Sequence, residues 1–306
     1  MSKALIRSRL FFGVFKSCTV GNYFRLNTRQ FAVIMGLIWA LGGSSSGHAQ
    51  WLEMGISSGA TSYVGDIPNP VGTFQWGAAG AAYAKYNFNP HWGLKVQWGV
   101  HRIHAADSLS GVASRDTINL SFRNNIQSAT LNVEFNFWPF VPGSRKKKSA
   151  PYVGLGIGRI SFDPQAKYRG EWVSLQPLGT EGQGLEDKPG LQGLVEEERY
   201  ALSAWAFPVT LGFRHNLRDK HSLGVEFVYC YTSTDYLDDI KGKFVDPSLL
   251  RLHRNGMAAD LSDRSWENGH TVRSPGTQRG VNAYNDAYWS LMVNYSYSIP
   301  SRRCRM

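Results

Sequence analysis

The feature that most constrains this chain is a series of eight stretches in which apolar and polar residues alternate with a period of two. The connections between them are alternately short and long. The short ones cover residues 89–90, 139–150 and 215–221, and the long ones cover 65–74, 104–126, 164–202 and 233–286. Barrels of the outer membrane have tight periplasmic turns and long outer loops, whereas a soluble sheet has no reason to keep its long loops at one end.

Each stretch has one apolar face and one face of polar or small residues. The third places Trp92, Val96 and Trp98 on one face, and Lys95 and Gln97 on the other. The stretches are about ten to thirteen residues long, as tilted bilayer-crossing strands are, whereas strands of soluble sandwiches usually have about five or six residues. The sequence therefore predicts an all-β fold, an eight-stranded antiparallel transmembrane β-barrel with its apolar faces toward lipid.

Charged residues fall on the predicted inner face of these strands. They are Lys85, Lys95, Glu134, Arg214 and Glu226. A barrel of about eight strands has room inside only for side chains. Because unpaired buried charge is costly, we expect an internal network of salt bridges and hydrogen bonds among these five. Gly154, Gly156 and Gly158 fit the same crowded interior better than a nucleotide-binding loop, since no helical pattern follows them.

Aromatic residues are predicted to form two girdles on the lipid face, as in membrane barrels. The girdle at the short-turn end comprises Phe88, Trp92, Phe137, Trp138, Tyr152, Phe213 and Tyr297. The girdle at the long-loop end comprises Trp76, Phe162, Trp205, Tyr231 and Trp289.

The N-terminal segment has the pattern of a signal peptide. Six basic residues and no acidic ones occur in residues 1–49, which contain an apolar run at 31–41 and a small-residue cleavage site before Gln50. An uncleaved anchor is the alternative. We expect a signal peptide at 1–49, a barrel at 50–299 and a basic tail at 300–306.

Most of the basic charge belongs to this leader. Its removal lowers the formal charge of +10 to about +4. No basic stripe with interleaved aromatics remains, so the sequence does not favour a nucleic-acid partner. Cys230 and Cys304 remain, and whether they pair is left open by the sequence.

A run of four cations, Arg145, Lys146, Lys147 and Lys148, lies in the connection 139–150. One interpretation is a solvated periplasmic turn. The other is contact with acidic lipid headgroups or with an acidic periplasmic partner.

Candidate catalytic and metal-binding groups are sparse. Asp235, Asp238 and Asp239 lack the spacing of an EF-hand, so capping of the loop is favoured over calcium binding. The histidines show no metal-ligand spacing, and no third group is placed to orient His221 beside Ser222. The sequence therefore predicts no cofactor and no enzyme activity.

Several segments together resemble the outer-membrane β-barrel family of Bacteroidota that includes PorG, a component of the type IX secretion and gliding machinery. They are residues 62–67 with Gly65 and Asp66, residues 151–156, residues 232–239 with Asp235, Tyr236, Asp238 and Asp239, and residues 278–288 with Arg279, Gly280, Asp286 and Tyr288. The basic tail after residue 299 departs from the aromatic strand terminus that usually ends such barrels.

The resemblance implies a non-enzymatic barrel that ties the periplasmic ring and lipoprotein subunits of a secretion complex to the outer membrane. The cluster at 145–148 and the turn at 215–221 then become docking candidates, and outer-membrane lipids surround the barrel. The alternatives are an adhesin-like barrel that binds through its long loops and, with less support, a lipid-modifying enzyme.

Overall fold

The computed structural model describes residues 51–70, 75–144, 146–193, 195, 198–280 and 284–300. All of them belong to one compact unit, residues 47–306. The predicted signal peptide, Gln50 at the predicted mature start, Arg145 and the tail beyond residue 300 lie outside the described residues, so the predictions made for them stay predictions.

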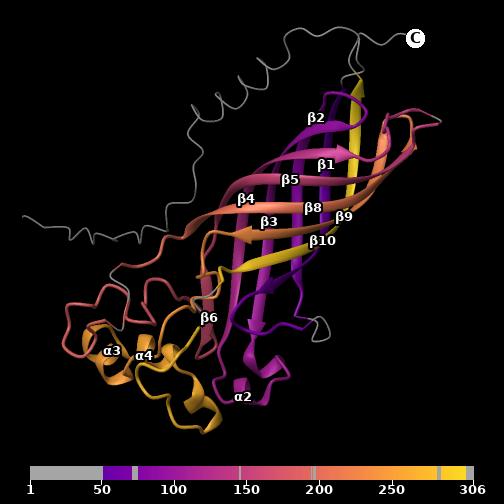
Figure 1. Ribbon diagram of the computed structural model, residues 1–306. Coiled ribbons are helices and arrows are strands. Elements are labelled where there is room, and N and C mark those ends of the chain that lie inside the picture. The colour runs from indigo at the N-terminus through magenta and orange to yellow at the C-terminus, as the bar shows by residue number, and fades with distance from the viewer. Residues whose placement is uncertain are drawn as a thin grey trace, which may run out of the picture. The chain divides into compact units, whose positions relative to one another are not determined.

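Eight antiparallel strands form a closed barrel (Figure 1). Their bounds are β1 Trp51–Val64, β2 Gly77–Asn87, β3 Trp92–Ala106, β4 Ser121–Asn136, β5 Ser149–Ser161, β8 Ser203–Arg218, β9 His221–Thr232 and β10 Ala287–Pro300. Each barrel strand pairs with the next barrel strand along the chain, including β5 with β8 across a long connection, and the pairing of β1 with β10 closes the ring. The predicted fold class is confirmed.

The long connections contain additional short elements at one end of the barrel (Figure 1). The hairpin of β6 (Pro164–Tyr168) and β7 (Glu171–Ser174) continues the sheet beside β4. The helical elements are η2 Asp107–Leu109, α2 Ala113–Asp116, α3 Pro247–His253, α4 Gly256–Ser262 and η3 Ser265–Asn268. None of the helices among the described residues is long and apolar enough to cross a membrane.

Two predicted connections are shorter than expected because the strands extend beyond the apolar alternation. β3 continues to Ala106 and β4 begins at Ser121, within the predicted loop 104–126, and β8 continues to Arg218. The turn from β8 to β9 is therefore only Asp219 and Lys220. The strands remain paired after their outward residues become polar. The alternation of apolar and polar residues, from which the strand ends were predicted, stops earlier.

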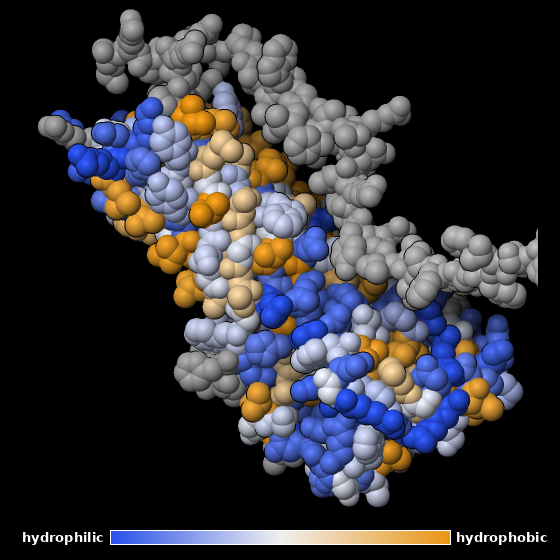
Figure 2. Space-filling model, turned by 180° about the vertical axis from the view of Figure 1, so that it is seen from behind, coloured by the Kyte–Doolittle hydropathy of each residue, from blue (hydrophilic) through white to orange (hydrophobic). Residues whose placement is uncertain are grey.

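Side chains alternate between a buried interior and an exposed outer face. On β9, Val225 is 49% exposed while its neighbour Glu226 is buried. A soluble barrel would bury the apolar face instead. Apolar residues accordingly spread over the barrel wall, while the long-loop end is largely hydrophilic (Figure 2). This reversal is what a lipid environment requires, because hydrocarbon cannot solvate charge.

Two residues, Tyr152 and Phe162, were wrongly assigned to the predicted aromatic girdles. Tyr152 is buried in the lumen, since it shares the inward face of β5 with Gly154 and Gly156, and Phe162 belongs to a buried apolar cluster at the long-loop end. Trp92, Phe137, Trp138, Phe213 and Tyr297 at one end, and Trp76, Trp205 and Tyr231 at the other, are exposed as predicted. Cys230 is buried with a free thiol, while Cys304 lies outside the described residues.

Tyr152 explains why the neighbouring strand carries a glycine. A Cβ atom at Gly212 would overlap the Tyr152 ring, whereas one at Gly80 would meet nothing closer than 3.7 Å. We predict that Gly212→Ala lowers the free energy of unfolding by about 1–3 kcal/mol through overpacking, and that Gly80→Ala leaves it nearly unchanged. Urea unfolding of the barrel refolded into lipid vesicles measures both, and equal effects would contradict the packing argument.

Candidate functional site

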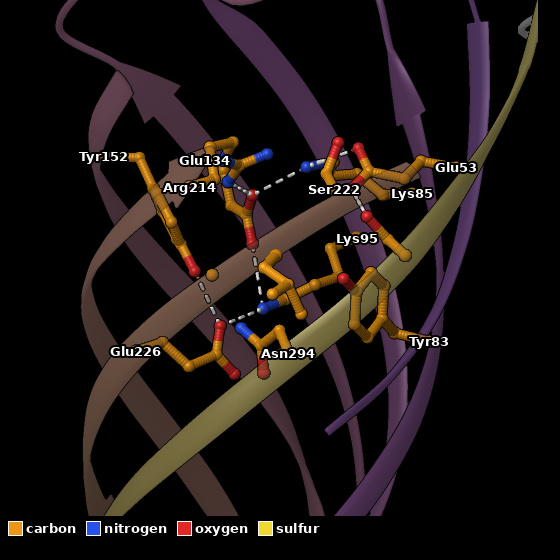
Figure 3. Close-up of a pocket in the computed structure, with 13 residues that line it drawn as sticks. Glu53, Tyr83, Lys85, Lys95, Glu134, Tyr152, Arg214, Ser222, Glu226 and Asn294 are labelled. Atoms are coloured by element: carbon orange, nitrogen blue, oxygen red, sulfur yellow. Dashed lines mark hydrogen bonds and ion pairs between the residues drawn. The ribbon is translucent and has the colours of Figure 1, made fainter. Parts of the chain in front are cut away.

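Six charged side chains meet inside the barrel near its short-turn end and form what we call the lumen network (Figure 3). Its members are Glu53, Lys85, Lys95, Glu134, Arg214 and Glu226. The Lys85 ammonium lies 2.9 Å from Glu53 and 3.5 Å from Glu134. The Lys95 ammonium lies 2.9 Å from Glu134 and 3.1 Å from Glu226, and Arg214 forms an ion pair with Glu134.

The structure thus brings together all five inner-face residues named from the sequence. The sequence interpretation missed Glu53, although its place between Leu52 and Met54 puts it on the polar face of the first stretch. With Glu53 included, the network holds three carboxylates and three cations and is formally neutral. All six are buried, so this balance avoids the large cost of an uncompensated charge away from water.

Neutral hydrogen-bonding groups complete the lumen network. The Tyr152 hydroxyl donates to Glu226 at 2.8 Å, and the Ser296 hydroxyl donates to Glu53 at 2.6 Å. The Arg214 guanidinium lies 3.9 Å from the centroid of the Tyr152 ring. Tyr152 therefore binds one member of the network through its hydroxyl and another through its ring face.

Side chains fill the lumen around this network. The cavity between them measures about 20 Å³, and a second cavity of the same size lies beside His101 and Pro208. Each has room for about one water molecule. Phe140 packs with Trp51 and Ala150 at the short-turn end, and a larger apolar cluster that includes Leu237 and Ile240 lies at the long-loop end. Among the described residues, side chains therefore occupy the lumen at both ends and around the lumen network.

Glu134 is the carboxylate that contacts all three cations of the lumen network. We predict that Glu134→Gln lowers the free energy of unfolding by about 3–5 kcal/mol, because it leaves the buried Arg214 without a counterion and the lumen network with an excess of one positive charge. The exposed Glu171 provides the matched control, and Glu171→Gln should change stability by less than about 0.5 kcal/mol. Urea unfolding in vesicles compares the two, and a native-like Glu134→Gln barrel would show that the network does not hold the wall together.

A second polar network, the loop-base network, lies where the long loops join the barrel. The Tyr63 hydroxyl lies 2.6 Å from a carboxylate oxygen of Asp238 and 2.7 Å from one of Asp286. The Asp66 N–H donates to the Tyr63 oxygen at 2.9 Å. These bonds join the end of β1 to both ends of the longest loop, residues 233–286.

The geometry of this group requires an additional proton. A tyrosine hydroxyl has one hydrogen and can donate it to only one of the two carboxylates. The other oxygens of Asp238 and Asp286 already accept the N–H groups of Ile240 and Leu237. Burial raises the pKa of both carboxyls well above the ordinary range. One of the two therefore keeps its proton at neutral pH and donates it to Tyr63.

The other motif residues connect two long loops to each other. Arg279 lies 2.8 Å from Glu181, in the loop after β7, and donates to the backbone carbonyl of Asp239 at 2.6 Å. The Asp239 carboxylate accepts the hydroxyls of Thr180 and Tyr200, both at 2.5 Å.

Packing around these bonds is close. The Tyr200 ring stacks on Tyr236 with 4.2 Å between centroids. A side chain at Gly280 would overlap Asp66 and the Lys241 backbone, and one at Gly65 would overlap Tyr63. Tyr288 is buried beneath the loops, beside His101.

The motif residues therefore form a structural junction. Asp235, Asp238 and Asp239 do not converge on one point, and among the described residues no group of three or more His, Cys, Asp or Glu could hold a metal ion. Loop capping, which the sequence favoured, agrees with this arrangement. Sequence reasoning missed Tyr63, Glu181 and Tyr200, whose roles depend on contacts between distant segments.

Titration of Asp235 makes the stability of the closed long loop, residues 233–286, depend on pH. Burial, and then the nearby Asp66, raise the pKa of Asp235 from 3.8 to about 7. In the open loop this carboxyl ionises near its ordinary pKa. Between about pH 4 and 7 the open form therefore binds fewer protons than the closed form. The closed form loses stability as the pH rises through this range.

We predict that the titration of Asp235 increases loop opening on the order of a hundredfold between pH 4.5 and 7.5. Asp235→Asn should remove this share and leave the smaller share of Asp239, whose pKa burial raises to about 6. Hydrogen exchange of the amides in residues 233–286, corrected for intrinsic rates, measures both. An identical pH dependence in the variant would contradict the assignment to Asp235.

The predicted docking candidates lie together at the opposite, short-turn end. Lys146, Lys147 and Lys148 are exposed. The Lys148 carbonyl accepts the Asn216 N–H at 2.7 Å, which joins the turn between β4 and β5 to the hairpin of β8 and β9. The imidazoles of the second turn have separate partners, since His215 lies 2.7 Å from the Ser149 hydroxyl and His221 lies 2.6 Å from the Tyr295 hydroxyl.

Comparisons with known proteins do not name a role for this chain. A family model described as a domain of unknown function (DUF6089) matches residues 28–172. A curated protein, the "MFS-type transporter gkaD" of Penicillium citrinum, is 27% identical over 192 residues, which are 60% of this chain and 30% of that protein. The chain thus spans less than a third of that relative.

The similar solved structures are small outer-membrane barrels. Neisserial surface protein A is 8% identical with a TM-score of 0.38, over 81% of this chain and 96% of that one. OprG of Pseudomonas aeruginosa is 11% identical with a TM-score of 0.35, over 83% and 97%. Ail of Yersinia pestis is 10% identical with a TM-score of 0.34, over 83% and 100%. The fold assignment rests on the strand pairing, and the resemblance to the family that includes PorG stays a prediction.

Proposed function

We propose that this protein is a non-enzymatic outer-membrane barrel that anchors a periplasmic assembly, in the manner that the resemblance to the family of PorG implies. The partners would be periplasmic ring and lipoprotein subunits of a type IX secretion complex. The observation that carries the proposal is the basic surface at the short-turn end, which in outer-membrane barrels faces the periplasm.

That surface has an excess of positive charge. Lys146, Lys147 and Lys148 from one turn are exposed beside Arg218 and Lys220 from the next, and Asp219 is the exposed acid between them. Such a patch attracts acidic partners and raises their rate of encounter. The side chains that occupy the lumen support the same function, because they leave the ends and the wall of the barrel as the surfaces for interactions.

The turn between β4 and β5 is held in place by the barrel. Phe140 is buried against Trp51 and Ala150, and its N–H donates to the Pro90 carbonyl at 3.0 Å. The Val141 N–H donates to the Lys147 carbonyl at 3.1 Å. A surface fixed before binding loses less conformational entropy on association, which favours docking over simple solvation of the lysines.

The test is recovery of partners by crosslinking from cells that carry the Lys146→Gln, Lys147→Gln, Lys148→Gln variant. Periplasmic ring and lipoprotein subunits should crosslink to the native barrel and about tenfold less to the variant, since rim charges act mainly on association. The matched control neutralises three exposed cations of the outer loops, Lys167, Arg169 and Lys188, and should retain native recovery. Unchanged recovery with the first variant would reject docking at this turn and favour binding through the long loops.

A further inference from the structure

Charge on the outward face of the barrel at the long-loop end is confined to one arc. Arg102 on β3, Arg123 on β4 and Arg159 on β5 form what we call the arginine belt. The outward residues immediately before Arg102 and Arg159 on their strands are the lipid-facing Val100 and Ile157, which are 42% and 48% exposed. The belt therefore begins where the apolar wall ends, at the depth of the outer headgroups.

The rest of the circumference is different. At the same end, the described outward residues of β8, β9, β10, β1 and β2 carry no charge. They include Ser203, which is polar, and the aromatic or aliphatic Trp205, Tyr231, Trp289, Val64 and Ala78. A general requirement for polarity at the interface would distribute charge around the barrel, so the arc on β3 to β5 needs its own explanation.

Strand register places Arg102 and Arg123 close together, and it places Arg159 farther along the wall on the next strand, because its partner on β4 is Ala129, four residues from Asn125. Arg102 pairs with Asn125, and Arg123 lies two residues from Asn125 on the same face of β4. Diagonal neighbours of this kind are about 7–8 Å apart. Arg159 pairs with Trp205 on the far side of β5, and its guanidinium lies 5.0 Å from that ring. Arg123 stacks 3.8 Å from the Trp172 ring of β7.

The three guanidinium groups have neutral hydrogen-bond partners. Arg102 donates to Asn125 at 3.1 Å, Arg123 donates to Gln165 at 3.1 and 3.0 Å, and Arg159 donates to Ser203 at 3.0 Å. In the part of the chain that the structure describes, none of them pairs with a carboxylate. Each guanidinium has five N–H donors, so most of these donors are left for partners outside the barrel wall. The cations inside the barrel, in contrast, each have a counterion.

Phosphate is the anion that this chemistry recognises best. Guanidinium groups bind phosphate oxygens in pairs, and stacking on tryptophan holds their planes in place. At headgroup depth the available phosphates are those of membrane lipids, which attract basic residues close to the membrane surface. We propose that the arginine belt binds phosphate groups carried by lipids of the outer leaflet, such as a phosphorylated glycolipid.

The test uses the full-length mature protein in phosphatidylcholine nanodiscs and fluorescent bisphosphorylated lipid A as the probe. The variant carries Arg102→Gln, Arg123→Gln and Arg159→Gln. The control carries Arg169→Gln, Lys188→Gln and Lys243→Gln, which removes the same charge from exposed cations of the long loops. The belt variant should bind the probe at least about tenfold more weakly than the native protein, while the control binds as the native protein does.

Two further arms distinguish the source of the phosphate. Dephosphorylated lipid A should bind the native protein as weakly as it binds the belt variant, and millimolar inorganic phosphate should not displace the probe. Native-like binding by the belt variant, equal binding of dephosphorylated lipid, or full displacement by free phosphate would each overturn the proposal. Circular dichroism and the mobility of unboiled samples on gels report folding. Should the triple variant fail to fold, Arg102→Gln and Arg159→Gln are measured singly, and unchanged binding by both would count against the belt.

Discussion

The structure depends on the pairing of charges around Glu134 inside the barrel. This carboxylate contacts Lys85, Lys95 and Arg214 together. It can do so because its register partners on both neighbouring strands are glycines, Gly93 and Gly154. The space that these residues leave is taken by the long cationic side chains. An apolar outer wall requires an inner face of a different kind, and a narrow lumen can hold charges only if they neutralise one another.

Because side chains occupy the lumen, the surfaces left for interactions are the ends and the outer wall of the barrel. At the long-loop end, Tyr63 attaches the longest loop to the barrel, and Arg279 attaches two long loops to each other. The motif residues that carry the family resemblance therefore maintain the fold. At the short-turn end, Phe140 fixes a turn whose lysines face the periplasm under the usual orientation of such barrels. Between the two, the outer wall carries cations on only one arc.

Much of the candidate site could be predicted because the sheet has a strict local period. Lys95 and Glu226 could be assigned to the interior because their sequence neighbours are apolar. The same rule assigns Glu53 to the interior, but a single acid in a weakly alternating stretch gave too little contrast for it to be recognised. Tyr152 was placed wrongly because its aromatic ring matched the expected girdle, although the glycines of its own strand indicated an inward face.

The sequence by itself determined the number of strands, the face of most strand residues and the asymmetry of the two ends, since each of these follows from local alternation and from connection length. The tertiary structure alone decided which charges meet, that the Tyr63 hydroxyl lies within hydrogen-bond distance of both Asp238 and Asp286, and that three arginines from adjacent strands lie on one arc of the wall. Those outcomes depend on register and closure between residues far apart in the chain. A period of two excludes a slip by one residue, which would exchange the two faces, but it does not distinguish registers that differ by two.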